Sequence, residues 1–498
     1  MQTDFPTMRS PAWIRCFILC ATCLLSVNVV FAQMPTYQKR AANVYEMQYN
    51  NGLRAVLKVD HRAPVLFFSI WYHVGSAEEP FGLTGIYHFL EHLMFRGTTL
   101  LPDGAYAAKI AQDGGEQNAF TSSDHTAYYA FLPTKHWLDA ATMDANRMHH
   151  LLLNTGVVDK ERQVILEERH WRVDEHPLAY AFERLNALYA GSPYAHPVIG
   201  WAGDIRQIND QDLYQWYCKW YQPDHATIVA VGDVSPQAFF NEIGRHYGAL
   251  LNTSQVISNA HKTYTPPDPV GRTDMRVRWG QYTRAVLLSY QVPVIKTLGR
   301  ATWPADALEV MAYMLAGNDH SVLTQSLVYQ SHLALHVAVY YDPFLLYDTA
   351  FTIVAIPATG VSLDRLQKAL LQQMAALWGR TDIDQQLAWA KTDAYADQVY
   401  NSDQLTTQGM WLGQLLSVGL PIRDEKTYQD GLRHITLSEL QTVSAQYCVP
   451  DNLKVVILSP RHERSVSETV QQNSQLSDAQ ASTVAQFWGQ GEQYAQMA

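Results

Sequence analysis

The chain has 498 residues, of which 47% are hydrophobic and 17% charged, so it is long enough for several domains and apolar enough to bury large cores. Its net charge of −11 argues against a nucleic-acid partner, because proteins that bind nucleic acids usually present a basic surface to the phosphates. Ordinary contents of glycine (27) and proline (22) exclude a collagen-like or low-complexity architecture.

Residues 1–32 have the pattern of a secretory signal peptide. Arg9 and Arg15 lie in the basic part, an apolar stretch covers 16–25, and small residues fit a cleavage site after Ala32. The alternative is a transmembrane anchor, which needs about 20 apolar residues, and the run here is shorter and interrupted by polar residues. We therefore expect an exported protein, periplasmic or secreted, with no membrane span after signal removal.

Cleavage there leaves Cys218 and Cys448 as the remaining cysteines. Two cysteines are too few for a disulfide scaffold in an exported protein of this size. We expect two buried, unpaired thiols, so the stability must come from large hydrophobic cores.

The next feature along the chain is the motif His88-Phe89-Leu90-Glu91-His92. Glycines precede it and Gly97 follows, which predicts a helix over about 84–96 that stops at Gly97. Residues four apart lie ~40° from each other around a helix, so His88 and His92 share a face and two neutral imidazoles there are able to bind one metal ion. Glu91 points the same way.

This spacing predicts hydrolytic chemistry. A bound zinc ion lowers the pKa of its water from about 15.7 to about 7, and a neighbouring carboxylate such as Glu91 then takes the proton and passes it to the leaving amine. The order H-x-x-E-H is a signature of zinc peptidases. The alternative is a pair of surface histidines on an amphipathic helix.

A second predicted helix, over 159–169, supplies candidates for a third zinc ligand. Glu161 and Glu168 are two helical turns apart and share a face, whereas Glu167 points elsewhere. A catalytic zinc needs three protein ligands and one open position. The spacing alone would favour a charged, solvated helix.

The polar, proline-containing stretch 252–272 reads as a linker, because proline fixes φ and removes backbone donors. It separates residues 42–251 from 273–465, and a polar tail over 466–498 follows.

The two parts resemble each other, which indicates an internal duplication. Each opens with an apolar strand, over 65–74 and 285–292, and closes with a helix, a Pro-Asp turn and a β-branched strand, over 220–231 and 446–457. Strands alternating with long helices predict an α/β or α+β sandwich in each half, with a sheet on one side and helices on the other, and we expect an α+β fold of two such halves.

Taken together, these segments resemble the pitrilysin–insulinase (M16) zinc metallopeptidase family, in particular its shorter branch with mitochondrial processing peptidase and bacterial relatives. The resemblance covers about residues 42–460 and is densest in the first half. It is carried by the segments 88–98, 118–128, 161–168 and 193–200.

The resemblance implies two homologous halves of the LuxS/MPP-like metallohydrolase type, facing each other as a clam shell around a chamber that favours small or unfolded peptides. It implies one zinc ion per chain, held by His88, His92 and Glu168, with Glu91 as the general base and Glu161 orienting a ligand. A strand beside the site would pair with an extended peptide by edge addition. The expected cleft residues are Asn118, Ala119, Phe120, Thr121 and Tyr128, and for Asn118 and Tyr128 a packing role is an equal alternative.

The second half lacks the metal signature, because its matching helix over 308–317 has no histidine. Ser331 and Leu335 stand where the family places an arginine and a tyrosine that bind the substrate backbone, and no Lys or Arg occurs from 317 to 343. We therefore hypothesise a zinc-bearing subunit of a two-chain peptidase, whose paralogous partner supplies this pair, or a homodimer. The alternative is that the pair is dispensable.

The leading interpretation is an exported zinc endopeptidase. The alternative is a non-catalytic assembly subunit with the same fold, although such members lose ligands or the base, and all four residues are present here. Zinc-dependent hydrolysis of a different bond is a third possibility.

Overall fold

The computed structural model describes residues 36–189, 191–252, 264, 271–280, 283–401, 403–422 and 425–461. The predicted signal peptide, most of the predicted linker and the predicted polar tail lie outside this part of the chain. No helix within it is long and apolar enough to cross a membrane.

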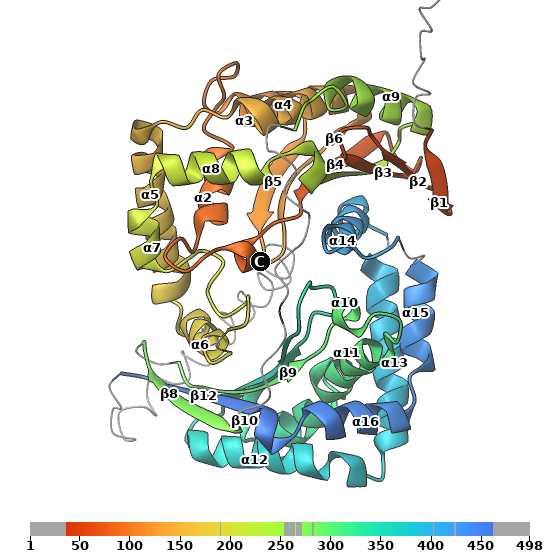
Figure 1. Ribbon diagram of the computed structural model, residues 1–498. Helices are drawn as coiled ribbons and strands as arrows, with labels where there is room; N and C mark the ends of the chain where they lie inside the picture. The colour runs from red at the N-terminus through yellow and green to blue at the C-terminus, as the bar shows by residue number, and fades with distance from the viewer. Residues whose placement is uncertain are drawn as a thin grey trace, which may run out of the picture. The chain divides into compact units, whose positions relative to one another are not determined.

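A seven-stranded mixed sheet forms the centre of the first half (Figure 1). Its strand order is β1-β2-β3-β7-β4-β6-β5, and β3 and β7 are the parallel pair. The strands are β1 (Gln38–Ala41), β2 (Val44–Gln48), β3 (Arg54–Val59), β4 (Val65–Tyr72), β5 (Glu116–Thr121), β6 (Thr126–Pro133) and β7 (Ala226–Gly232).

The helices of the first half lie mainly between its strands in sequence. The α-helices are α2 (Ile86–Leu93), α3 (Ala105–Gln112), α4 (Trp137–His150), α5 (Thr155–Arg169), α6 (Pro177–Asn186), α7 (Ala202–Gln207), α8 (Asp210–Trp220) and α9 (Pro236–His246). The short helical turns are η1 (Ser76–Glu78), η2 (Thr134–His136), η4 (Pro223–His225) and the π-helical η3 (His170–Asp174).

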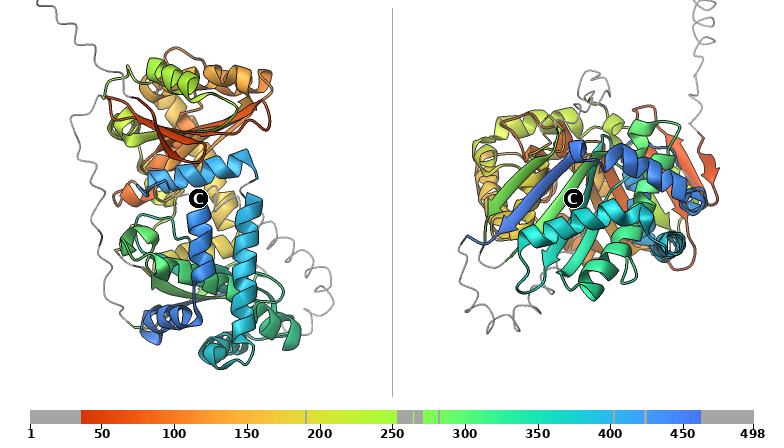
Figure 2. Two further views of the ribbon diagram at one scale, coloured as in Figure 1. Left: turned by 90° about the vertical axis from the view of Figure 1, so that its right-hand side faces the viewer. Right: turned by 90° about the horizontal axis from the view of Figure 1, so that it is seen from below.

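The second half contains a five-stranded sheet with the order β10-β11-β9-β12-β8. Its strands are β8 (Thr273–Arg278), β9 (Ala285–Val292), β10 (Ala334–Tyr340), β11 (Thr349–Pro357) and β12 (Leu453–Ser459). Its helices are α10 (Ile295–Leu298), α11 (Trp303–Ala316), α12 (Leu363–Ala376), α13 (Ile383–Asn401), α14 (Leu405–Ser417), α15 (Glu425–His434) and α16 (Leu437–Tyr447), with the turns η5 (Thr324–Gln330), η6 (Leu377–Gly379) and η7 (Pro450–Asn452). Figure 2 (right) shows α12 running across the strands of this sheet.

The two sheets repeat one topology. The order β3-β7-β4-β6-β5 of the first corresponds strand by strand to β8-β12-β9-β11-β10 of the second, and β8 pairs parallel to β12 as β3 does to β7. The prediction of an α+β fold with two homologous halves is therefore confirmed. The clam-shell arrangement of the halves stays a prediction.

Helices of the same half cover one face of each sheet, as expected, and a helix of the other half covers the opposite face. Along β4, Phe68 and Tyr72 pack among helices of their own half, whereas Phe67 and Trp71 pack against Leu412 of α14, a helix of the second half. A β-strand directs alternate side chains to opposite faces, so an apolar run in which both sets are buried needs a second covering layer.

Glycines bring α14 close to the first sheet. A Cβ atom built at Gly409 would lie 2.2 Å from the ring of Phe67, and one at Gly413 would lie 1.9 Å from the indole of Trp71. The second sheet receives a helix in return, because Leu178 of α6 packs with Val456 of β12. Each half thus contributes one helix to the other half's sheet.

Local boundaries differ from the predictions where backbone conformation decides them. The metal-motif helix is shorter than 84–96, because Gly85 is its N-cap with φ of +88° and Met94 is its C-cap. The helix predicted over 159–169 begins earlier, at Thr155, since the side chain of Asn154 caps it by accepting the N–H of Val157. Cys218 and Cys448 are free, as expected, but half-buried rather than buried.

Candidate metal centre

Helices α2 and α5 bring the three predicted ligands together. His88 and His92 lie one turn apart on α2, and Glu168 lies near the end of α5. The Oε2 atom of Glu168 is 3.1 Å from Nε2 of His92 and 3.7 Å from Nε2 of His88. The three ligand atoms lie within 4.8 Å of one another, which is close enough to share one ion.

Glu161 fixes the orientation of the His92 ring. Nδ1 of His92 donates a 2.8 Å hydrogen bond to Oε1 of the buried Glu161, which leaves Nε2 directed toward Glu168. Arg96 donates from Nε to the other oxygen of Glu161 at 2.6 Å. A carboxylate behind a ligating imidazole is the usual arrangement in zinc sites.

Two arginines that were not among the predicted site residues also contact the centre. Arg96 holds Glu161, and Nε of Arg172 lies 2.9 Å from Oε1 of Glu168. The signal for both was their position one helical turn after a site residue, since Arg96 follows His92 by four and Arg172 follows Glu168 by four.

The electrostatics of the three ligands suit a cation. Burial lowers the pKa of His88 to about 3, so this imidazole is neutral. Burial also opposes a proton on His92, but hydrogen bonds with Glu161 and Glu168 raise the pKa of His92 to about 9. Burial acts to raise the pKa of Glu168, and the contacts with His92 and His88 outweigh it and lower that pKa to about 2.

These values describe a site that holds one positive charge between two imidazoles and a carboxylate. Without an ion, that charge is a proton on His92. Two imidazole nitrogens and a carboxylate oxygen are the donor set of catalytic zinc sites, so the residues fit a zinc ion.

Glu91 lies in the same helix and is held by the neighbouring strand. Its Oε2 accepts a 2.7 Å hydrogen bond from the hydroxyl of Thr121, the last residue of β5. Burial raises the pKa of Glu91 to about 7, and the bond from Thr121 partly offsets this. A carboxyl group with such a pKa is suited to accept and return a proton near neutral pH.

The other predicted cleft residues occupy different positions along the edge strand. Asn118 is exposed on β5, and its Oδ1 accepts the N–H of Ala119. Ala119 and Phe120 are buried, and the ring of Phe120 packs edge-on against Trp71. Thr121 is thus the residue of this segment that contacts the predicted base.

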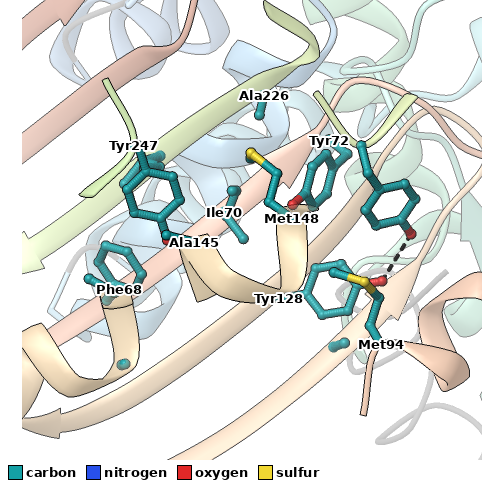
Figure 3. Close-up of a cluster of buried hydrophobic side chains, with 14 of the residues drawn as sticks. Phe68, Ile70, Tyr72, Met94, Tyr128, Ala145, Met148, Ala226 and Tyr247 are labelled. Carbon is teal, nitrogen blue, oxygen red and sulfur yellow. Dashed lines mark hydrogen bonds between the residues drawn. The ribbon is translucent and has the colours of Figure 1, made fainter. Parts of the chain in front are cut away.

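Tyr128 belongs to the hydrophobic core. It is fully buried in a cluster with Tyr72, Met94 and Met148 (Figure 3), and its hydroxyl lies 2.9 Å from that of Tyr221. This burial supports the packing role for Tyr128, and a role of Tyr128 in the cleft stays a prediction.

A second group of metal-binding side chains among the described residues consists of Asp113, His136 and Asp139. The ammonium group of Lys109 lies 2.6 Å from Asp113 and 2.5 Å from Asp139. An ammonium group thus already lies between these two carboxylates, so this group is better described as a surface ion-pair cluster.

The second half presents no comparable centre at the equivalent helix, α11. Ser331 caps η5 by donating to the carbonyl of Ser326 at 2.6 Å, and Leu335 is 40% exposed on β10. One cation that the sequence pattern missed lies near this segment: Arg380 is 3.5 Å from Oγ of Ser326, with its guanidinium paired to Asp382.

The chain belongs to the M16 peptidase family. The family model described as insulinase (peptidase family M16) matches residues 54–201, and the family model of the peptidase M16 inactive domain matches residues 207–386. The zinc protease PqqE of Helicobacter pylori is 28% identical over 413 residues, which cover 82% of this chain and 91% of that protein.

Solved structures agree in fold. A protease from Helicobacter pylori superposes with a TM-score of 0.79 at 25% identity, covering 86% of this chain and 100% of that chain. The periplasmic protease PqqL of Escherichia coli matches with a TM-score of 0.71 at 17% identity, covering 87% of this chain and 49% of that chain, and this likeness concerns the fold alone.

Proposed function

We propose that the protein is an exported zinc metalloendopeptidase that hydrolyses small or unfolded peptides. The observation that carries the proposal is the convergence of His88, His92 and Glu168 beside a buried, hydrogen-bonded Glu91. Membership of the M16 family and the similarity to a zinc protease support it.

His88, His92 and Glu168 would hold the zinc ion, and the rest of the chemistry falls to Glu91. A zinc ion bound by three protein ligands supplies a polarised water and a Lewis acid for the peptide carbonyl. Glu91 takes the proton of the attacking water and delivers it to the leaving amine. The bond from Thr121 engages Oε2 of Glu91, which leaves the other carboxylate oxygen for this proton.

The peptide would bind along β5. This strand is at the edge of the first sheet, so its outer backbone groups are placed to pair with an extended chain. Backbone pairing is independent of sequence and requires an unfolded segment. The strand ends at Thr121, which is hydrogen-bonded to Glu91, so a peptide paired with β5 would lie close to the proposed base.

The proposal includes export and a two-chain assembly. The signal-peptide pattern of residues 1–32 supports export. Ser331 and Leu335 support a partner that supplies the missing arginine and tyrosine, and the engagement of Arg380 by Asp382 is consistent with that need. If the chain purified alone is fully active and gains nothing from a paralogous partner, the assembly part of the proposal is wrong.

A peptide-cleavage assay on the wild type and Glu91→Gln tests the enzymatic function. We expect Glu91→Gln to keep its zinc and lose turnover by at least ~10²-fold, because general-base catalysis contributes about 10²–10⁴. Glu167→Gln, on the exposed face of α5, is the matched control and should cleave at the wild-type rate. Equal rates for wild type and Glu91→Gln would reject the mechanism.

A further inference from the structure

A short segment of the second half, Leu346–Tyr347, contacts two turns of the first half. One turn is hydrogen-bonded to the start of the metal-motif helix α2, and the other is hydrogen-bonded to Glu91 on the same helix. We call residues 75–79 the first turn and residues 121–125 the second turn. Neither turn contains a metal ligand, and each is hydrogen-bonded to α2 or its N-cap.

The first turn caps the metal helix through Glu79. The side chain of Glu79 is fully buried; one carboxylate oxygen accepts the N–H of Gly85 at 2.8 Å, and the other accepts the N–H of Tyr87 at 3.1 Å. Gly85 is the N-cap of α2, and a Cβ atom there would lie 2.5 Å from the carbonyl oxygen of Ile199. No capping side chain fits at Gly85, so a carboxylate from six residues earlier satisfies the open N–H groups.

This cap lies directly beside the metal centre. The capped Tyr87 precedes the ligand His88, so the position of Glu79 sets the first turn of α2. The second turn positions the proposed base, because it begins with Thr121, whose hydroxyl donates a hydrogen bond to Glu91.

The two turns are joined to each other. The N–H of Ser76 donates to the carbonyl of Ser122 at 3.1 Å, and the N–H of Ala77 donates to that of Ser123 at 2.8 Å. Their approach is so close that a Cβ atom at Gly75 would lie 2.3 Å from the carbonyl oxygen of Ser122. A shift of one turn therefore moves the other.

The second half contacts both turns. The hydroxyl of Tyr347 donates to Oε1 of Glu78 at 3.1 Å, and the N–H of Leu346 donates to Oδ2 of Asp124 at 2.9 Å. The N–H of Tyr347 also donates to the hydroxyl of Tyr194, which in turn donates to Asp124 at 2.8 Å. Glu78, Asp124 and Tyr347 are all buried, so these bonds are expensive to lose.

We infer that Tyr347 is a positioning residue for the metal centre. Through Tyr347, the second half fixes the positions of Glu79 and Thr121 relative to α2. The half that carries no metal ligand thereby determines the geometry of the half that does. The consequence for turnover rests on the proposed function, whereas the consequence for the order of α2 does not.

The experiment compares Tyr347→Phe with Tyr189→Phe in the full-length protein. Both variants remove one hydroxyl that crosses between the halves, because Tyr189 bonds to Oγ of Ser289 at 2.7 Å, but Tyr189 lies outside both turns. We measure hydrogen–deuterium exchange of peptides covering 80–93 without zinc, zinc affinity by chelator competition, and kcat and KM for a peptide.

For Tyr347→Phe we expect faster exchange at the start of α2, a zinc affinity about tenfold weaker and a kcat about tenfold lower at unchanged KM, the lower end of what loss of a supporting residue costs. Tyr189→Phe should match the wild type in all of these. Because Tyr347 acts through the turn that carries Glu79, adding Glu79→Gln should give less than the sum of the two single effects.

The inference is overturned if Tyr347→Phe and Tyr189→Phe have the same amide exchange rates in α2, the same zinc affinity and the same kcat. It is also overturned if the effects of Tyr347→Phe and Glu79→Gln are fully additive. A wild type that neither binds zinc nor cleaves peptides would reject the proposed function. In that case the amide exchange rates of α2 would still show whether Tyr347 is coupled to this helix.

Discussion

The hydroxyl of Thr121 and Oε2 of Glu91 are joined by a 2.7 Å hydrogen bond that links the edge strand β5 to the metal helix α2. Thr121 is buried at the end of β5, opposite Thr126 of β6. The strand proposed to bind the peptide and the residue proposed to move its proton are thus in direct contact.

Replacing this hydroxyl should change how the base titrates. The bond stabilises the carboxylate form of Glu91 and lowers its pKa, so Thr121→Val should raise that pKa above its value of about 7. Less Glu91 is then ionised at neutral pH. We expect kcat at pH 7 to fall by about tenfold or less and the acid limb of the kcat–pH profile to move to higher pH.

The matched control is Thr142→Val, which removes a hydroxyl on the exposed side of α4. Its profile should coincide with that of the wild type. An acid limb that stays in place in Thr121→Val would show that this bond does not tune the base.

Zinc binding should compete with a proton on His92. Because the pKa of His92 without an ion is about 9, zinc affinity should rise about tenfold per pH unit from pH 7 to pH 9, with release of a proton. Glu161→Gln removes a carboxylate that favours this proton, so the rise should end at a lower pH. Above pH 9 the variant should bind zinc about 10–100-fold more weakly, since the ring loses its partner.

Calorimetric titration with a competing chelator, in buffers of different protonation enthalpy, measures both affinity and proton release. Glu242→Gln on α9 is a control of the same chemistry at the surface. A zinc affinity that is independent of pH in the wild type would contradict this description of His92.

Glu309 in the second half should make stability decline with pH. Burial raises the pKa of Glu309 to about 8 from its ordinary value of 4.5, and Asp306 and Asp342 add to this, whereas a hydrogen bond from Tyr428 opposes it. The folded state therefore binds this proton more tightly than the unfolded state. Its contribution is fully present below about pH 4.5 and is lost as the pH rises to about 8.

Glu309→Gln imitates the protonated form, so it should be more stable than the wild type at pH 8, on the order of 1–3 kcal/mol, and similar to it at pH 5. Thermal unfolding of both proteins from pH 5 to pH 8 measures the difference, with Glu167→Gln as the control. Parallel stability curves for the wild type and Glu309→Gln would contradict the assignment.

The contact of α14 with the first sheet predicts a large effect of one methyl group. In Gly413→Ala the new Cβ would lie 1.9 Å from the indole of Trp71, so helix and sheet must move apart, at a cost of about 1–3 kcal/mol. Gly203→Ala on α7 places its Cβ in open space and should be neutral or stabilising by up to ~1 kcal/mol. Denaturant unfolding distinguishes them, and equal stabilities would contradict the packing of α14.

The sequence contained enough information for the parts of the site that follow helical spacing. His88, Glu91 and His92 are fixed relative to one another by one turn of helix, and Glu161 and Glu168 by two turns, so local periodicity places each set. The duplication was visible because strands such as 285–292 keep both their length and their turn signals.

Contacts between distant segments had no such local signal. The helix α14 is apolar on several sides, which is compatible with burial in either half, and only the structure shows that Gly413 lies against Trp71. Glu79 caps α2 from a loop, without the spacing of a capping box. Tyr128 and Thr121 both belonged to the predicted cleft, but β6 is apolar on both faces, so its pattern did not reveal which side Tyr128 takes.

The zinc stoichiometry of the purified full-length protein, measured by equilibrium dialysis and elemental analysis, tests the central claim most directly. The wild type and Asp139→Ala, a variant of the surface ion-pair cluster, should each bind one zinc ion per chain, and Glu168→Ala should lose most of it at the same free zinc concentration. Full zinc occupancy in Glu168→Ala, or its loss in Asp139→Ala, would contradict the assignment of the ion to His88, His92 and Glu168.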